Sequence, residues 1–368
     1  MGRKILFVIG QMGCGGAERV VANVANYLCD QGDAVALHHF QSKDYQSFYA
    51  LDPRIRLFHI DYHTRKPRRL WDYVILFVKA VLSLRKVTKT TFKPDVIISV
   101  GASTNILVLL STWGLKIPVI VRETIDLDVV FNNKNIFNKI REIFYLKAAA
   151  IVCLSHKMKN FFKNNLRKKI FLIPGGTRID MVKKNWIPTK KIVSVSRLTF
   201  QKDMQTLIKA FFEFERYKPN YILTIYGDGD MRQELQKMID NYGLRDKVTL
   251  AGNVHNPKSH YEDYDFFVTA SRYEGVPNAV LEALSVGLPV LATDMSVTHI
   301  EGVKDNDNML LVPVGDVKAM AEAMTQMVEN QDLYNKIRTN GQKLLSFYDH
   351  DKIMSDWDCL INEVMKDG

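Results

Sequence analysis

Short apolar runs rich in β-branched residues alternate with helix-like segments along the chain, and this alternation is the feature that most constrains its fold. In residues 1–182 the predicted strands are Ile5–Ile9, Ala34–His39, Ile55–His59, Val96–Val100, Val119–Val121, Ala150–Leu154 and Ile170–Ile173. The predicted helices between them are Ala17–Cys29, Trp71–Thr90 and Asn138–Lys147. Strands that alternate with helices in this way predict a parallel sheet covered by helices, which is an α/β fold.

The alternation begins again after a polar, proline-containing linker at residues 183–189. The second set of predicted strands is Ile192–Ser196, Tyr221–Tyr226, Val248–Ala251, Phe266–Thr269, Val290–Thr293 and Met309–Val312. The helices of this half are predicted near Met204–Tyr217, Met231–Asn241, Pro277–Val286 and Asp316–Glu329.

The chain has 368 residues, and single cores stop growing near roughly 250–300 residues. We therefore predict two doubly wound, Rossmann-like domains, residues 1–182 and 190–345, that face each other across a ligand cleft at the carboxyl ends of their strands. The last segment, residues 346–368, is expected to be a helix that packs back on the first domain.

Composition narrows the class of protein. With 47% hydrophobic and 24% charged residues, the chain is neither disordered nor a coiled coil. Its four cysteines form no C-x-x-C pair, so neither a disulfide scaffold nor a zinc site is indicated. The apolar run after Met1 is too short for a signal peptide, and we interpret it as a strand of a cytoplasmic protein.

The formal charge of +10 is a property of the first half of the chain. Residues 1–182 carry 28 Lys and Arg against 13 Asp and Glu, a net +15, whereas residues 183–368 carry 22 against 27, a net −5. The apolar segment Trp71–Leu84 is too short to span a bilayer. Cations flank it on both sides: Arg65, Lys66, Arg68, Arg69, Arg85, Lys86, Lys89 and Lys93. This pattern predicts a helix in an anionic membrane interface, with a buried helix as the alternative.

Two glycine-rich turns follow predicted strands. The first contains Gly15 and Gly16, and the second contains Gly227 and Gly229. Glycines there allow a close backbone approach to a ligand, and the helix start that follows offers N–H groups to a phosphate. The first spacing is not G-x-G-x-x-G, which disfavours a dinucleotide-dependent dehydrogenase. The alternatives are a plain tight turn at the first site and an aspartate helix cap at the second.

Charged residues follow two further strands of the second half. Arg197 and Lys202 come after Ile192–Ser196, where both cations can converge on a diphosphate. Glu274 and Glu282 frame a predicted helix start, with Pro277 at its first position. Carboxylates placed there can accept hydrogen bonds from ribose or sugar hydroxyls. The alternatives are surface cations and a solvated Glu282.

In these ordered motifs the chain resembles the retaining glycosyltransferases of the GT4 family, which have the two-domain GT-B fold. The matching motifs are Gly15-Gly16-Ala17-Glu18, Ser196-Arg197 with Lys202, Gly227-Asp228-Gly229, and Glu274-Gly275 with Glu282. The resemblance covers almost the whole chain. It implies that Arg197 and Lys202 neutralise the nucleotide diphosphate, and that Glu274 contacts the donor sugar, as the catalytic residues.

The resemblance implies that residues 1–182 form the acceptor-binding, membrane-facing domain and residues 190–345 the nucleotide-sugar-binding domain. It also implies a wider donor site. Glu282 binds the ribose, Gly15 and Gly16 approach the β-phosphate and the acceptor, and Val254 borders the base. The remaining donor-binding positions are Gly227, Gly229, Gly275, Val276, Pro277, Asn278 and Ala279. No metal and no cofactor is expected, because the cations and the helix start supply the positive charge.

Relatives in this family often carry a histidine after the strand that corresponds to Val119–Val121, but this chain has none there. Glu123, Thr124 and Asp126 are the candidates for contact with the sugar or the acceptor, and His156 is a further candidate whose alternative role is structural.

The implied function is transfer of a hexose or N-acetylhexosamine from a nucleotide-sugar, a UDP-sugar first of all, to a polyprenyl-diphosphate-linked saccharide in surface-polysaccharide or glycoprotein-glycan assembly. The enzyme would act as a peripheral protein on the inner face of the cytoplasmic membrane. One alternative is a sugar-nucleotide epimerase of the same fold. A nucleic-acid-binding protein is disfavoured, because the cations lie on helices and at strand ends rather than on a strand platform.

Overall fold

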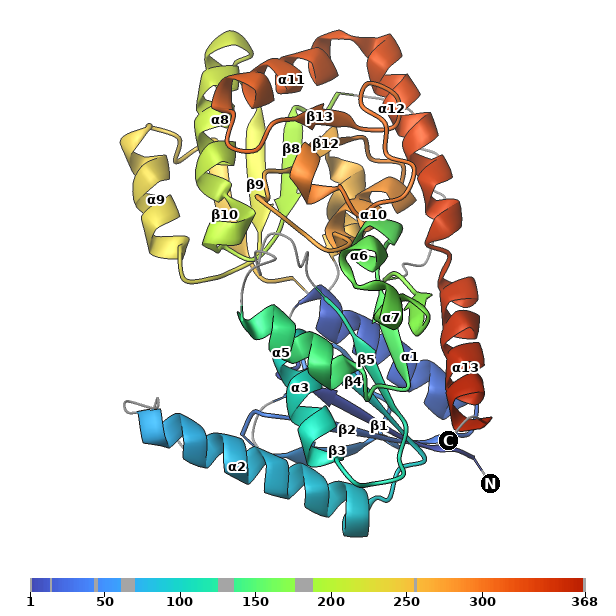
Figure 1. Cartoon of the computed structure of the whole chain (residues 1–368). Coiled ribbons are helices and arrows are strands. Elements are labelled where there is room, and N and C mark those ends of the chain that lie inside the picture. The colour runs from blue at the N-terminus through green and yellow to red at the C-terminus, as the bar shows by residue number, and fades with distance from the viewer. Residues whose placement is uncertain are drawn as a thin grey trace. The chain divides into compact units, whose positions relative to one another are not determined.

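The computed structural model describes residues 2–13, 15–42, 46–60, 70–124, 136–175, 188–254 and 257–366 (Figure 1). The chain forms two compact units. Unit 1 comprises Met1–Gly175 together with Asp351–Gly368, and unit 2 comprises Gly176–His350. Most of the predicted linker, residues 183–187, lies outside the described residues.

Unit 1 is built on a seven-stranded sheet whose order is β3-β2-β1-β4-β5-β6-β7. All adjacent strands pair in parallel, as the alternating pattern predicts. The strands are β1 (Lys4–Ile9), β2 (Ala34–His39), β3 (Arg56–His59), β4 (Val96–Val100), β5 (Val119–Arg122), β6 (Ala150–Cys153) and β7 (Ile170–Leu172). The helices are α1 (Gly16–Asp30), α2 (Leu70–Lys86), α3 (Ala102–Ser111), α5 (Ile136–Tyr145), α6 (His156–Phe161), α7 (Asn164–Arg167) and α13 (His350–Lys366).

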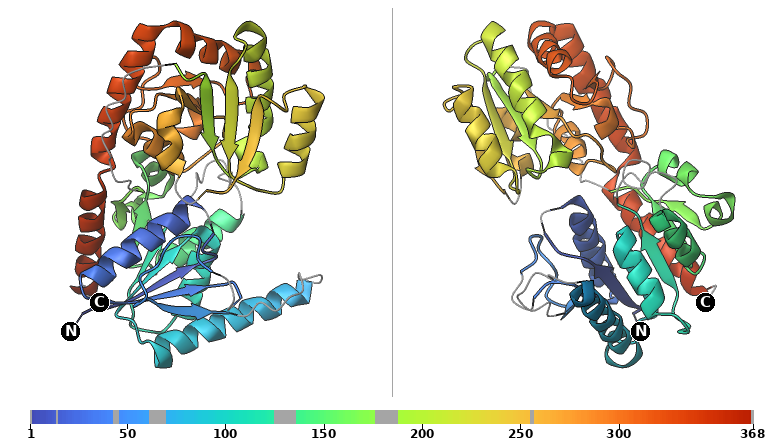
Figure 2. Two further views of the ribbon diagram at one scale, coloured as in Figure 1. Left: turned by 180° about the vertical axis from the view of Figure 1, so that it is seen from behind. Right: turned by 60° about the vertical axis from the view of Figure 1, so that its left-hand side comes forward.

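The core of unit 1 includes the C-terminal helix. Side chains of α13 pack in the same buried cluster as those of α1 and the central strands, and Figures 1 and 2 show α13 beside α1. Trp357 and Ile361 of this helix are 1% and 0% exposed. Arg3, just before β1, forms an ion pair of 2.6 Å with Asp358 of α13. The last helix therefore completes the hydrophobic core of unit 1.

Unit 2 contains a second parallel sheet, of six strands in the order β10-β9-β8-β11-β12-β13. Its strands are β8 (Lys191–Val195), β9 (Ile222–Tyr226), β10 (Val248–Gly252), β11 (Phe266–Thr269), β12 (Val290–Thr293) and β13 (Leu310–Val312). Its helices are α8 (Met204–Tyr217), α9 (Arg232–Asn241), α10 (Asn278–Ser285), α11 (Val317–Glu329) and α12 (Gln331–Lys343). Figure 2 shows helices on both faces of the sheet in each unit.

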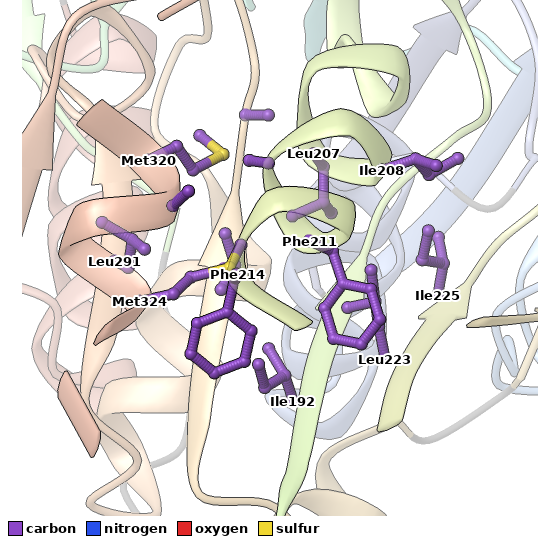
Figure 3. Close-up of a cluster of buried hydrophobic side chains, with 14 of the residues drawn as sticks. Ile192, Leu207, Ile208, Phe211, Phe214, Leu223, Ile225, Leu291, Met320 and Met324 are labelled. Carbon is purple, nitrogen blue, oxygen red and sulfur yellow. The ribbon is translucent and has the colours of Figure 1, made fainter. Parts of the chain in front are cut away.

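The larger core cluster of unit 2 lies between the sheet and the pair α8 and α11. Figure 3 shows Phe211 and Phe214 of α8 pointing toward Leu223 of β9 and Met324 of α11. Phe211, Phe214 and Leu223 are 0% exposed. This cluster fixes α8 against the sheet, and α8 begins directly after the loop that carries Lys202.

Helix α2 is half buried and half exposed. Ala80 and Leu84 are buried on its inner side, next to α3. Five large apolar residues of α2 are exposed. Four of them are spaced by four, three and four residues, which places them on one helix face; these are Trp71, Ile75, Val78 and Leu82, and the fifth is Phe77. The alternative of a fully buried helix is therefore wrong. No described helix is long and apolar enough to cross a bilayer.

Candidate functional site

Two loops of unit 2 meet at the carboxyl ends of neighbouring strands. The first follows β8 and the second follows β11, and these strands pair in parallel with Phe266 opposite Ile192. The Arg272 amide donates a hydrogen bond of 2.8 Å to the carbonyl of Gln201. The Gln201 amide side chain in turn donates one of 2.9 Å to the carbonyl of Tyr273. The loops that hold Lys202 and Glu274 are thus bonded to each other.

The structure brings together the predicted catalytic residues Lys202 and Glu274. The Lys202 ammonium group and the Glu274 carboxylate form a hydrogen-bonded ion pair, with side chains 15% and 12% exposed. Ser271 donates a hydrogen bond of 2.9 Å to the same Glu274 oxygen. Thr293 holds the backbone of Ser271 through a bond of 2.6 Å to its carbonyl. An ammonium group and a carboxylate are therefore fixed side by side, largely shielded from water.

The two glycines of the Gly227-Asp228-Gly229 turn allow close contact with the loop after β8. A Cβ at Gly227, whose φ is +131°, would lie 1.8 Å from the carbonyl oxygen of Ser196. A Cβ at Gly229 would lie 2.3 Å from that of Leu198. Hydrogen bonds join the same segments, since Leu198 donates to the Asp228 carbonyl and Met231 donates to the Leu198 carbonyl, both at 3.0 Å. The close packing against the loop that carries Lys202 therefore explains why both positions are glycine. Their predicted role near the donor is a separate expectation.

Helix α10 begins at Asn278, and Pro277 is its extended N-cap residue rather than its first helical residue. The alternative of a solvated Glu282 is wrong, because Glu282 is only 3% exposed. Helix α10 is buried on almost every side, so the Glu282 carboxylate is held within unit 2. Val254 is half-buried after β10, and Arg197 is exposed.

Sequence reasoning missed the ion pair between Arg272 and Asp203, at 2.9 Å. Asp203 has a left-handed backbone, with φ of +48°, and its carboxylate accepts a hydrogen bond from Thr206 as the N-cap of α8. An aspartate just before a predicted helix is a readable capping signal. The partner arginine is 69 positions away, and no local pattern indicates it.

In unit 1 the Gly15-Gly16 turn begins α1, with Gly15 as its N-cap. A Cβ at Gly15 would lie 2.2 Å from a carboxylate oxygen of Glu18, which is itself 8% exposed. The glycine therefore makes room for a buried carboxylate at the start of the helix. Figure 1 shows α1 following β1 from the carboxyl end of that strand.

Glu123 lies in a buried polar cluster rather than on the surface. It is 1% exposed, and Tyr145 donates a hydrogen bond of 2.5 Å to its carboxylate. Arg141, 0% exposed, lies 3.5 Å from the same oxygen, and Asn105 donates to the Tyr145 hydroxyl at 2.7 Å. Burial raises the pKa of Glu123, while the Arg141 charge opposes this rise. Its neighbour Arg122 is also buried, which lowers the pKa of that guanidinium to about 10.

The other acceptor candidates differ in position. Thr124 is half-buried after β5, and His156 is exposed at the start of α6, where Ser155 caps the helix by accepting a bond from Met158. Asp126 lies outside the described residues.

Two family models match the chain. The description "Glycosyl transferases group 1" matches residues 178–344, and "Glycosyltransferase Family 4" matches residues 14–180. A similar curated protein is the Campylobacter jejuni GalNAc-alpha-(1->4)-GalNAc-alpha-(1->3)-diNAcBac-PP-undecaprenol alpha-1,4-N-acetyl-D-galactosaminyltransferase, 26% identical over 98% of this chain and 99% of that protein. A second, from the same organism, is an N-acetylgalactosamine-N,N'-diacetylbacillosaminyl-diphospho-undecaprenol 4-alpha-N-acetylgalactosaminyltransferase, 25% identical over 96% and 98%.

Solved structures share the fold over the full length. Sucrose-phosphate synthase from Thermosynechococcus elongatus superimposes with a TM-score of 0.84 at 17% identity, covering 100% of both chains. Anabaena Alr3699/HepE, in complex with UDP and glucose, gives a TM-score of 0.75 at 18% identity, covering 98% of this chain and 100% of that one. The predicted fold of two Rossmann-like domains is confirmed. The chain belongs to the group 1, or family 4, glycosyltransferases of the GT-B fold.

Proposed function

We propose that this glycosyltransferase moves a hexose or N-acetylhexosamine from a UDP-sugar to a polyprenyl-diphosphate-linked saccharide, with retention of configuration and without a metal ion. The observation that carries the proposal is the shielded pair of Lys202 and Glu274 at the carboxyl ends of β8 and β11. Relatives that match this chain over nearly its whole length are named for transfer to undecaprenyl-diphosphate-linked saccharides, which supports the acceptor class.

The pair suits a donor that carries a diphosphate and a sugar. A diphosphate competes with the Glu274 carboxylate for the Lys202 ammonium group, because both are anions that accept charge-assisted hydrogen bonds. Once released, Glu274 can accept hydrogen bonds from sugar hydroxyls, while Ser271 keeps one of its oxygens in place. Arg197, exposed and five positions before Lys202, is the second cation that we assign to the diphosphate.

The reaction step needs positive charge where the leaving group forms. The bond between the anomeric carbon and the diphosphate oxygen breaks, and the electron pair stays with the diphosphate, where Lys202 and Arg197 stabilise it. The acceptor hydroxyl bonds to the anomeric carbon from the same face. Its proton passes to the departing phosphate oxygen, so no side-chain base is required and the configuration is retained.

Substitution of the site tests this assignment. Lys202→Ala and Glu282→Ala are expected to abolish transfer, with Lys318→Ala, an exposed lysine of α11, as the matched control. Thermal stabilisation by a panel of nucleotide-sugars identifies the donor, and transfer onto synthetic lipid-linked acceptors identifies the acceptor. Full transfer activity in both site variants would overturn the assigned site. The anomeric configuration of the product, measured by NMR, tests retention, and activity after EDTA treatment tests metal independence.

We also propose that unit 1 binds the inner face of an anionic membrane through α2. Its exposed apolar face would enter the interface, while the exposed cations Lys79, Lys86 and Lys89 meet the lipid phosphates. Trp71 and Leu82, 73% and 61% exposed, lie eleven residues apart on this face. A peripheral location of this kind would bring the enzyme to a lipid-linked acceptor.

Co-sedimentation with vesicles of phosphatidylglycerol and phosphatidylethanolamine tests the membrane proposal. The double variant Trp71→Ser, Leu82→Ser is expected to remain in the supernatant, whereas the wild type pellets with the vesicles. The control, Tyr217→Ser with Phe347→Ser, removes exposed aromatic rings of unit 2 and should pellet like the wild type. Equal recovery of the wild type in the supernatant with and without vesicles refutes the proposal.

A further inference from the structure

An exposed aromatic ring belongs to the same short turn as Lys202. Phe200 begins the short 3-10 turn Phe200–Lys202 and is 66% exposed, whereas the side chains of Lys202 and Glu274 are 15% and 12% exposed. A phenyl ring left in water forgoes about 2 kcal/mol of burial free energy. Because this ring shares a turn with Lys202, a substrate that reaches the turn can cover it during the reaction.

The ring is held in place from one side. The Arg272 guanidinium lies over it, 4.5 Å from the ring centroid, which is a cation–π contact. Arg272 is fixed in turn by its ion pair with Asp203, a 3%-exposed residue that caps α8. The backbone of Arg272 is also bonded to Gln201, the neighbour of Phe200. Phe200 therefore presents an ordered, open ring surface rather than a side chain free to rotate.

We propose that Phe200 is a stacking platform for a pyranose ring of the acceptor saccharide, and that it contributes to acceptor specificity. The proposal rests on the transferase function proposed above. One face of a pyranose carries several C–H groups with slight positive charge, which suit the negative face of an aromatic ring. The donor diphosphate and sugar are assigned to the shielded polar groups Lys202 and Glu274. Phe200 belongs to the same turn as Lys202, is far more exposed and takes no part in the donor assignment, so its ring is left for the second substrate.

Saturation-transfer NMR tests this platform without need of the natural acceptor. The probes are methyl glycosides of glucose, galactose, N-acetylglucosamine and N-acetylgalactosamine, each with and without UDP. The wild type should saturate the ring protons of at least one glycoside. Phe200→Ala should weaken the affinity of the protein for that glycoside about threefold to tenfold, whereas Phe200→Trp should retain this affinity. Tyr217→Ala is the control, because Tyr217 is 75% exposed at the far end of α8.

The outcomes separate this proposal from the proposed function. A wild type that saturates none of the four glycosides, or a Phe200→Ala variant that binds them as well as the wild type, overturns the platform. If the wild type does not bind UDP but gives a glycoside signal that depends on Phe200, the donor assignment is contradicted and the platform is supported. With a lipid-linked acceptor in hand, Phe200→Ala should raise KM for the acceptor and leave KM for the donor unchanged. A change confined to KM for the donor overturns the acceptor assignment.

Discussion

Gly229→Ala tests how the loop that carries Lys202 is held, since the effect of this substitution can be worked out from the structure. The new Cβ would lie 2.3 Å from the Leu198 carbonyl oxygen, where real contacts stay above 3.0 Å, so the two must separate by about 0.7 Å. This shift stretches the 3.0 Å bond from Met231 to the same carbonyl. A lost hydrogen bond of about 1 kcal/mol and overpacking of about 1–3 kcal/mol predict a loss of about 2–4 kcal/mol in the free energy of unfolding.

Gly243→Ala is the matched control. Gly243 also lies in unit 2, with φ of +66°, but nothing lies within 4 Å of its added Cβ. Only the left-handed strain of about 1–2 kcal/mol is expected there. In thermal unfolding of a unit this size, about 2–4 °C is lost per kcal/mol. Gly229→Ala should therefore unfold at a temperature about 5–15 °C lower than the wild type, and Gly243→Ala at one about 2–8 °C lower.

The variants should also differ in donor binding. Leu198 lies four positions before Lys202, so a displaced loop should reduce the thermal stabilisation that UDP gives to Gly229→Ala, while Gly243→Ala keeps it. If Gly229→Ala is no less stable than Gly243→Ala and binds UDP as well, the explanation of this glycine by loop contact is wrong.

Three further predictions concern unit 1. His38 is 0% exposed, and burial lowers the pKa of this imidazole from 6.5 to about 4. As the pH falls below 6.5, His38 is therefore protonated in the unfolded chain before it is protonated in the folded one. The free energy of unfolding should then fall by about 1.4 kcal/mol per pH unit between pH 6.5 and pH 4. Urea unfolding at pH 7 and pH 5 should show this loss in the wild type and a smaller loss in His38→Leu. Tyr145→Phe removes the hydroxyl between Asn105 and Glu123 and should cost about 1–3 kcal/mol in urea unfolding, with Tyr27→Phe as the control; an unchanged midpoint would contradict the buried network. Trp357→Ala should cost about 3–5 kcal/mol by the same measurement, and a loss below 1 kcal/mol would show that α13 does not complete the core.

The strands were predictable because buried parallel strands are short, apolar and β-branched whatever their tertiary setting. Every predicted strand is present, with ends that differ by one residue at most. Helix α3 was missed, because Ala102–Ser111 is apolar on nearly all sides and merges in sequence with the strand that follows. Such a segment lacks the periodic polar face that identifies a helix.

The sequence indicates which residues to consider for the candidate site, but not which of them touch. Strand-end position and residue type indicated Lys202 and Glu274, whose ion pair depends on the pairing of β8 with β11. The burial of Glu282 could not be foreseen, because a glutamate is ordinarily exposed, whereas α10 is buried on almost every side. The burial of Glu123, directly after β5, could not be foreseen either, because its partners Arg141 and Tyr145 come from α5, about twenty positions later in the chain.

The contribution of α13 to the core of unit 1 has a consequence for synthesis on the ribosome. Residues 1–175 emerge first, but they lack the helix that buries Trp357 and Ile361 against α1. All of unit 2, residues 176–350, must be translated before that helix appears. We expect the second unit to be able to fold first, while the earlier-made unit waits with part of its core uncovered. Arrest peptides placed after residue 350 and after residue 366 would measure the folding force at these two chain lengths. A rise in force at the longer length would report the late folding of unit 1.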